Sequence, residues 1–194
     1  MQRLRGEAEL SGFLATPFEG GDGQLGIGWR AALGVGWDRL PFTVGLDFEG
    51  AYFGTSSSRD VILIDGQRLV VDQQRSDSAL FLDVFARLQP LWPVRPYLEG
   101  AVGPKRLHRE YELSFPGEAF APETTSADDW TYTLGLGLGL DVPLGGSLWL
   151  TGGVRRLFGG RVSYERALVA TGGGVIRYDA STTTTTFSLG LIVR

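Results

Sequence analysis

A run of alternating leucine and glycine constrains this chain more than any other feature. Residues 133–141 read TLGLGLGLD, so leucine and glycine alternate without a break from Leu134 to Leu140. A period of two is the repeat of a β-strand, in which successive side chains point to opposite faces. One face of this strand is therefore leucine and the other is glycine. Because glycine weakens a strand and gives a water-exposed sheet little, the glycine face requires a structural explanation.

Alternation with a period of two recurs along the chain between turn signals, whereas the helical period is nearly absent. It predicts eight strands, each close to the roughly 9–11 residues that a tilted strand needs to cross a bilayer. No linker interrupts residues 1–194, so we expect a single domain. The predicted strands are Glu7–Ala15, Leu25–Trp37, Phe42–Phe53, Ala79–Gln89, Val94–Arg106, Trp130–Asp141, Ser147–Leu157 and Thr184–Arg194.

The connections between these strands alternate between short and long. Those after the second, fourth and sixth strands are short, so the long connections share the opposite end, as they do in transmembrane barrels. Residues 61–71, with a turn at Asp65–Gly66, are predicted to form a hairpin that extends its strands beyond the barrel. Residues 162–178, with Gly172–Gly174 between two apolar runs, are predicted to do the same. Residues 110–129 look irregular.

The two faces of the predicted strands differ in chemistry, and the alternation alone leaves two barrels open. A soluble lipocalin-like barrel would bury the aliphatic face, whereas a membrane barrel would turn it toward lipid. Small residues on the polar face suit a narrow eight-stranded lumen, and aromatic residues gather near strand ends, as in interfacial girdles. The prediction is an all-β fold, an eight-stranded antiparallel up-and-down transmembrane β-barrel.

The polar face carries charges of both signs in nearly equal numbers. Buried charges must be paired and hydrogen-bonded to be tolerated, so we expect an ion-pair network that fills the lumen. A static polar core is favoured over a gated path for protons or ions. The predicted lumen network is Glu7, Glu9, Arg30, Asp47, Glu49, Asp83, Arg87, Arg95, Glu99, Lys105 and Arg155.

One strand carries a family resemblance. Residues 95–103, RPYLEGAVG, resemble the "R-P-Y-x-x-x-G-x-G" strand of small outer-membrane barrels, and residues 132–157 resemble the strand pair that follows it. The resemblance is to the outer membrane protein A and X type. It implies a Gram-negative outer membrane and insertion by the barrel assembly machinery. We expect the protein to be a monomer. Members commonly end in an aromatic residue, whereas this sequence ends at Arg194, and we expect no peptidoglycan-binding domain after the last strand.

An enzymatic function is not expected. Some small barrels process lipid A, and a hydrolase of that kind needs a histidine beside a serine and a carboxylate. The single histidine, His108, has only Ser114 and Glu110 near it in sequence, and no His-x-Ser spacing occurs. The Gly-x-Gly repeats lie inside a strand with no helix after them, so they are not a nucleotide loop.

Basic residues continue the lipid-facing parity of two strands toward the long-loop end. We therefore expect Arg106, His108 and Arg156, with Arg109 and Arg161, to contact lipopolysaccharide phosphates, although ordinary snorkelling at the rim explains them equally well.

Composition narrows the remaining functions. The chain has no cysteine, one histidine and a net charge of -4, which argues against a disulfide framework, a thiolate or multi-histidine metal site and a nucleic-acid binder. No cofactor or metal is expected. No stretch of 18 apolar residues suits a transmembrane helix. The first five residues show no signal-peptide core, so the chain either is cytoplasmic or begins at the mature protein.

The expected function is a structural or surface-interaction role through residues 55–78 and 159–183, with extracellular proteins as possible partners. The alternatives are a narrow outer-membrane channel for small or hydrophobic solutes, and a soluble binding barrel.

Overall fold

The computed structural model describes residues 4–18, 24–37, 40–64, 67–90, 92–114, 123–168 and 174–194. Most of these residues form strands, and no helix among them is long and apolar enough to cross a membrane. The strands are β1 (Leu4–Ala15), β2 (Gly26–Trp37), β3 (Phe42–Ile64), β4 (Gln67–Leu88), β5 (Arg95–Ser114), β6 (Glu123–Gly145), β7 (Leu148–Gly159), β8 (Arg161–Leu168), β9 (Gly174–Ser181) and β10 (Thr184–Val193).

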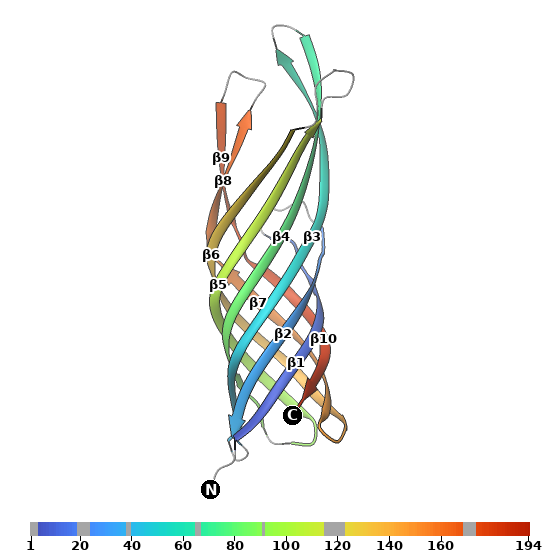
Figure 1. Cartoon of the computed structure of the whole chain (residues 1–194), viewed down its shortest axis with the longest axis vertical. Coiled ribbons are helices and arrows are strands. Elements are labelled where there is room, and N and C mark those ends of the chain that lie inside the picture. The colour runs from blue at the N-terminus through green and yellow to red at the C-terminus, as the bar shows by residue number, and fades with distance from the viewer. Residues whose placement is uncertain are drawn as a thin grey trace.

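Eight of these strands close into one antiparallel barrel in the order β1-β10-β7-β6-β5-β4-β3-β2. The barrel is closed because β1 pairs with both β2 and β10, for example through Leu10, which lies opposite Ala31 and Leu191. The start of β1 and the end of β10 lie at the same end as the short connections (Figure 1). The predicted fold class, with eight strands and long connections at one end, is confirmed.

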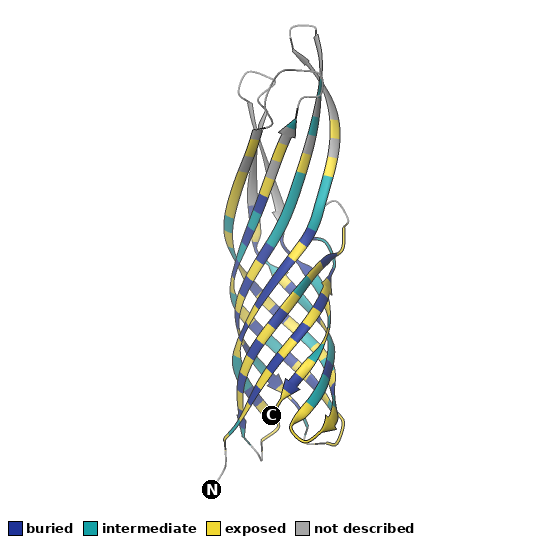
Figure 2. Cartoon of the chain, turned by 45° about the vertical axis from the view of Figure 1, so that its right-hand side comes forward, coloured by how far each residue is buried: buried dark blue, intermediate teal, exposed yellow. Residues whose placement is uncertain are grey.

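The outer face of the barrel is apolar and the inner face is polar. Leu134, Leu136, Leu138 and Leu140 are all exposed, and Leu138 keeps 62% of its surface accessible. Buried and exposed residues alternate along the barrel strands (Figure 2). Burying charge while exposing leucine is the reverse of a soluble barrel, and it fits a protein whose surrounding solvent is lipid. The lipocalin-like alternative is therefore wrong.

The glycine face gives room to large side chains inside the barrel. A Cβ atom on Gly139 would collide with the ring of Tyr97, and one on Gly45 would collide with the ring of Phe85. Gly137 lies against the Arg155 side chain, where an added Cβ would be 3.2 Å from the arginine Cβ. The glycines of the lumen thus make space for aromatic rings as well as for the charged side chains that we expected.

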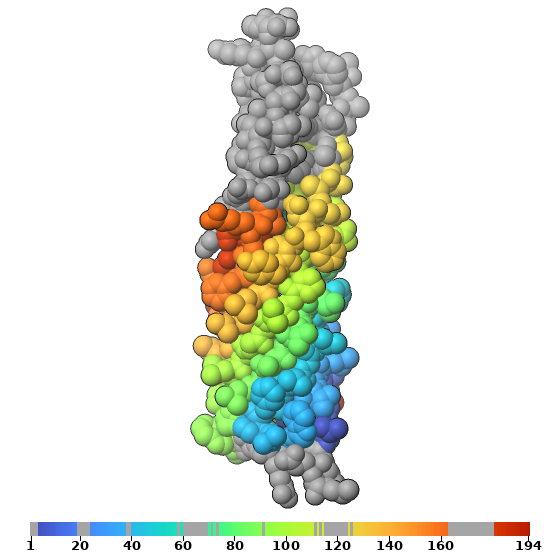
Figure 3. All heavy atoms as spheres, turned by 90° about the vertical axis from the view of Figure 1, so that its left-hand side faces the viewer, coloured from blue at the N-terminus to red at the C-terminus, as the bar shows by residue number. Residues whose placement is uncertain are grey.

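The barrel strands run obliquely across the face of the molecule (Figure 3), and four of them, β3 to β6, continue past the other strands (Figure 1). We call this part the extension: residues 55–64 of β3, 67–76 of β4, 109–114 of β5 and 123–127 of β6. β3 pairs with β4 as far as Ile64 and Gln67, and β5 pairs with β6 as far as Leu113 and Glu123. The first predicted hairpin is confirmed in its strands, while its turn at Asp65–Gly66 lies outside the described residues.

Two expectations for the long connections need correction. Residues 110–129 are not irregular, because both strands continue in unbroken register through Glu110 and Ser126, and only residues 115–122 lie outside the described part. The second hairpin does not continue β7 and β10 but forms a separate sheet, β8–β9, after a break at Gly160 and at residues 182–183. The backbone carbonyl of Gly160 accepts hydrogen bonds from the Thr182 amide and hydroxyl, which fixes that break. Residues 169–173, including part of the predicted glycine turn, are not described.

Candidate functional site in the barrel lumen

Three arginines hold the centre of the lumen, and each bridges carboxylates from different strands. Arg30 on β2 donates to Asp47 Oδ2 through Nη2 at 2.7 Å and to Glu9 Oε1 through Nη1 at 3.3 Å. Its Nη2 atom also lies 2.9 Å from Glu99 Oε1. One guanidinium therefore links strands β1, β3 and β5. Its planar fork of donors suits such a junction better than a lysine would.

Arg87 on β4, two strands away from Arg30 in the barrel, joins the same junction. It donates to Glu9 Oε2 at 2.8 Å and to Glu99 Oε2 at 2.7 Å, and its side chain has no accessible surface. The guanidinium carbon lies 4.3 Å from the centre of the Tyr97 ring, which is a cation–π geometry. Glu9 and Glu99 are therefore each shared between Arg87 and Arg30.

Arg155 on β7 completes the centre. It donates to Asp47 Oδ2 at 3.1 Å and forms an ion pair with Glu49. Beside it lies a cavity of only about 10 Å³, bordered by Arg30, Tyr97 and Glu99. A space of this size is about what one water molecule needs.

A second cluster closes the lumen at the end with short connections. Arg194, the last residue, donates to Glu7 Oε2 at 3.1 Å, to Asp141 Oδ2 at 2.5 Å and to the side-chain oxygen of Gln89 at 3.0 Å. Gln89 in turn donates to Asp141. The sequence prediction omitted Arg194 and Asp141 from the network, although both have the inward parity of their strands.

The mouth at the opposite end is closed by aromatic rings around a lysine. Lys105 Nζ donates to the backbone carbonyl of Thr182 at 2.7 Å and lies 4.1 Å from the Phe18 ring centre. Phe18 and Phe53 pack with their ring centres 4.2 Å apart. Just above them, Asp77 forms ion pairs with Arg75 and Arg109. Burial raises the pKa of Asp77, but its hydrogen bonds from the two arginines outweigh burial and hold that pKa below its ordinary value.

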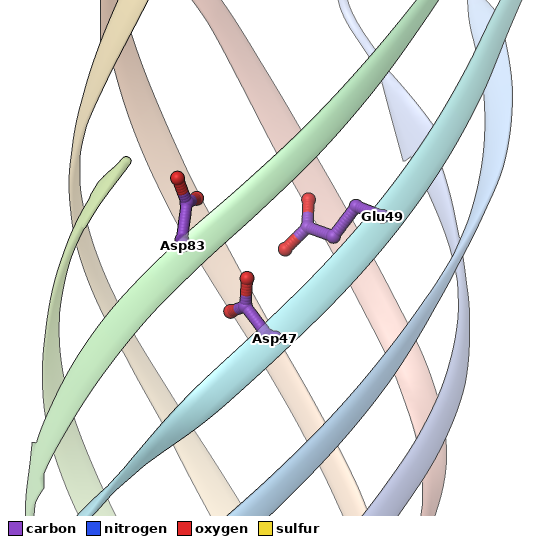
Figure 4. A group of neighbouring side chains, drawn as sticks. All are labelled: Asp47, Glu49 and Asp83. Carbon is purple, nitrogen blue, oxygen red and sulfur yellow. The ribbon is translucent and has the colours of Figure 1, made fainter. Parts of the chain in front are cut away.

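Three acidic side chains meet on the wall formed by β3 and β4 (Figure 4). Asp47 lies directly opposite Asp83 in the register, and one carboxylate oxygen from each of Asp47, Glu49 and Asp83 falls within 4.8 Å of the others. Like charges directly opposite each other destabilise a sheet. Arg30 and Arg155 contact Asp47 and Glu49, so they already supply the positive charge that a metal ion would otherwise bring.

The structure buries ten of the eleven residues predicted for the lumen network but does not pair all of them as expected. Asp83 is fully buried, and neither of its carboxylate oxygens has a hydrogen-bond partner in the described part of the chain. Lys105 binds a carbonyl and aromatic rings in place of a carboxylate. Arg95 is the exception in position: it is only half-buried, donates to the Trp92 carbonyl and stacks on Trp149 at the short-connection end.

The residues predicted to contact lipopolysaccharide occupy four different environments. Arg106 and His108 both contact Asp128, at 3.0 Å in each case, so the positive charge of Arg106 is partly compensated. Arg156 donates to the Thr185 hydroxyl at 2.8 Å, and Arg161 is exposed. Arg109 is buried and paired with Asp77, so its inclusion in this outward-facing set needs correction. Its strand parity, which is that of Lys105, already indicated an inward direction.

Comparisons with known proteins give the fold. No protein-family model and no curated protein matches this chain. Among solved structures, Neisserial surface protein A is 13% identical over 98% of each chain, with a TM-score of 0.54. A major outer membrane protein from Thermus thermophilus is 18% identical over 96% of this chain and 98% of that one, with a TM-score of 0.55. Identities this low indicate a shared fold and no more, and that fold is the one of the small outer-membrane β-barrels.

Proposed function

We propose that this protein is a monomeric surface protein of a bacterial outer membrane, with a lumen that does not conduct and an extension that contacts molecules outside the cell. The observation that carries the proposal is the contrast between the barrel and the extension, which are built from the same strands. Inside the barrel, buried ion pairs join side chains across the lumen, and beyond it four strands, β3 to β6, continue as a paired sheet. This role requires no catalytic step.

The closed lumen is supported at three levels along the axis. Arg194 fills the end with the short connections, three arginines cross the centre, and Lys105 with Phe18 and Phe53 fills the mouth. The cavity at the mouth, bordered by Phe18 and Phe53, has a volume of about 20 Å³. Opening a path would break several buried ion pairs, and leaving one charge of such a pair unpaired costs about 3–5 kcal/mol.

The extension is suited to contact with partners because its outer strands have unpaired edges. The pairing between β2 and β3 ends at Ile27 and Tyr52, and the pairing between β6 and β7 ends at Thr133 and Gly159. Within the described part of the chain, no strand therefore pairs with the second edge of β3 above Tyr52, where the Gln24 side chain donates to the Thr55 carbonyl at 2.9 Å. Such an edge can accept an extended peptide as an additional strand. Extracellular proteins are the proposed partners of this edge. Lipopolysaccharide is proposed to surround the barrel, and the barrel assembly machinery is proposed to insert it.

One variant separates the two halves of this proposal. Replacing residues 57–74 by a two-residue turn should leave the barrel folded, which heat-dependent gel migration would report. In planar bilayers the full chain and the trimmed variant should both fail to conduct, whereas cells displaying the trimmed variant should adhere less to host-cell monolayers. Steady single-channel currents from the full chain would support the narrow-channel alternative, and unchanged adhesion would remove the role of the β3–β4 part of the extension.

A further inference from the structure

Three polar side chains far apart in the sequence form one row on the outer surface of the barrel. In the sheet register Ser78 on β4 lies directly opposite His108 on β5, and His108 lies directly opposite Asp128 on β6. All three have the outward parity of Leu80 and Trp130 on their strands. Side chains directly opposite each other on one face have Cβ atoms about 4.5–5.5 Å apart. Ser78, His108 and Asp128 are therefore immediate neighbours.

The histidine and the aspartate are already arranged as a base and its orienting group. His108 Nδ1 lies 3.0 Å from Asp128 Oδ1, and Arg106 holds the same carboxylate with two hydrogen bonds, at 3.1 and 3.0 Å. The hydrogen bonds from Arg106 are the largest cause that keeps the pKa of Asp128 below its ordinary value, and the bond from His108 adds to it. A carboxylate on Nδ1 places the proton there and leaves Nε2 as the acceptor, which is the arrangement of a serine hydrolase.

An apolar groove adjoins the serine. It has a volume of about 490 Å³ and is open on the outer surface, with Ser78 at its border among Trp29, Gly50, Tyr52 and Leu80. The row of residues one step closer to the membrane contains Trp29, Leu80, Arg106 and Trp130 in register. Tryptophans mark the interface where lipid headgroups begin. An acyl chain lying in this groove would bring its ester bond to the level of Ser78.

We propose that Ser78, His108 and Asp128 form an esterase site that faces the outer leaflet and takes an acyl ester of a membrane lipid. His108 Nε2 removes the Ser78 hydroxyl proton as Oγ attacks the ester carbonyl carbon. The bond to the lipid alkoxide then breaks, and His108 returns the proton to that leaving oxygen. A water molecule, deprotonated by His108, hydrolyses the acyl-serine to a free fatty acid and restores the enzyme. The Arg106 guanidinium supplies positive charge near the developing oxyanion.

The site stands apart from the lumen, so a non-conducting barrel could carry it unchanged. Along the sequence His108 has only Ser114 and Glu110 nearby, and Glu110 shares its strand face. Across the sheet the same histidine meets a serine thirty residues before it and an aspartate twenty residues after it. The residue pattern of one strand does not indicate these two partners, because the relative register of β4, β5 and β6 determines them.

The test uses the full chain in vesicles of phosphatidylcholine, with and without added lipopolysaccharide, and measures released fatty acid by mass spectrometry. The wild-type protein should release fatty acid, while Ser78→Ala and His108→Gln should each lower the rate at least about 100-fold. Ser126→Ala is the matched control, since Ser126 has the same outward parity on β6 but lies opposite Glu110. The control should keep the wild-type rate.

A fluorophosphonate probe provides the second measurement and should label the Ser78 peptide, with labelling lost in Ser78→Ala and His108→Gln. Folding of each variant is checked by heat-dependent gel migration. Release in both vesicle types would identify glycerophospholipid esters as substrates, and release only with lipopolysaccharide would identify its acyl esters. The proposal is overturned if folded wild-type protein neither releases fatty acid nor takes up the probe, or if Ser78→Ala does both as well as wild type.

Discussion

The barrel and the extension contain the same kind of ion pair in opposite surroundings. In the extension, Arg59 donates to both oxygens of Asp72, at 2.6 and 2.8 Å, with the arginine side chain 68% exposed. In the barrel, Arg87 makes contacts of the same length to Glu9 and Glu99 with no exposure at all. A solvent-exposed ion pair generally contributes little to stability, whereas a buried one is costly to break. The geometry of an ion pair therefore does not reveal its importance unless its burial is known.

The largest expected effect on stability comes from removing the buried arginine of this comparison. Arg87→Ala leaves Glu9 and Glu99 short of one partner in the lumen, and we expect a loss of about 3–5 kcal/mol in the free energy of unfolding. Arg59→Ala is the matched change in the extension and should alter stability by no more than about 0.5 kcal/mol. Urea titration of both variants in detergent micelles measures the difference.

The two outcomes that would contradict this reading are distinct. Equal stability of Arg87→Ala and wild type would mean that Arg30 alone suffices to neutralise Glu9 and Glu99. A large loss in Arg59→Ala would mean that the extension and the barrel unfold as one unit.

Glycines provide a second way to sharpen the comparison, this time between the inner and outer faces of the barrel. Gly139→Ala introduces a methyl group into the space of the Tyr97 ring, and overpacking of this kind costs about 1–3 kcal/mol. Gly100→Ala is the matched change on the outer face, where an added Cβ would have no neighbouring atom within 4 Å. The same urea titration should show a loss for Gly139→Ala and none for Gly100→Ala. Equal effects would mean that strand propensity, rather than lumen packing, sets the cost.

The sequence predicts which way each barrel residue points, but it does not predict what that residue touches. Parity along a strand places Leu138 outside and Glu99 inside without any knowledge of the neighbours. The partners of Glu99 come from β2, β4 and β7, and they depend on the relative register of those strands. For that reason the ion-pair network could be predicted as a set, whereas the unpaired Asp83 and the carbonyl partner of Lys105 could not.

The ends of the strands were the least predictable part for a related reason. Residues 110–129 lack the apolar alternation that indicates a strand. Backbone pairing carries β5 and β6 through that segment in unbroken register. The break at Gly160 depends on the carbonyl that binds Thr182, and a hairpin pattern in the sequence contains no sign of such a contact.

The boundary between the two regions is where the smallest effect is expected. Arg106 and Arg156 face outward near the end of the barrel, and lipopolysaccharide phosphates are the proposed ligands. Each already has a protein partner, since Arg106 binds Asp128 and Arg156 binds the Thr185 hydroxyl. A guanidinium has five N–H donors, so a phosphate can share each arginine, but the gain is reduced by the charge of Asp128 in the first case.

We therefore expect lipopolysaccharide to raise the melting temperature of the wild-type protein modestly, and to raise that of the Arg106→Glu, Arg156→Glu double variant less. Arg59→Glu makes the same change of charge at one site in the extension, away from the lipid boundary, and should retain the full increase. Melting temperatures in detergent with and without added lipopolysaccharide measure this, and raising the salt concentration should shrink the difference. An increase that is equal in all three proteins would show that ordinary rim solvation, and not phosphate binding, accounts for the two arginines.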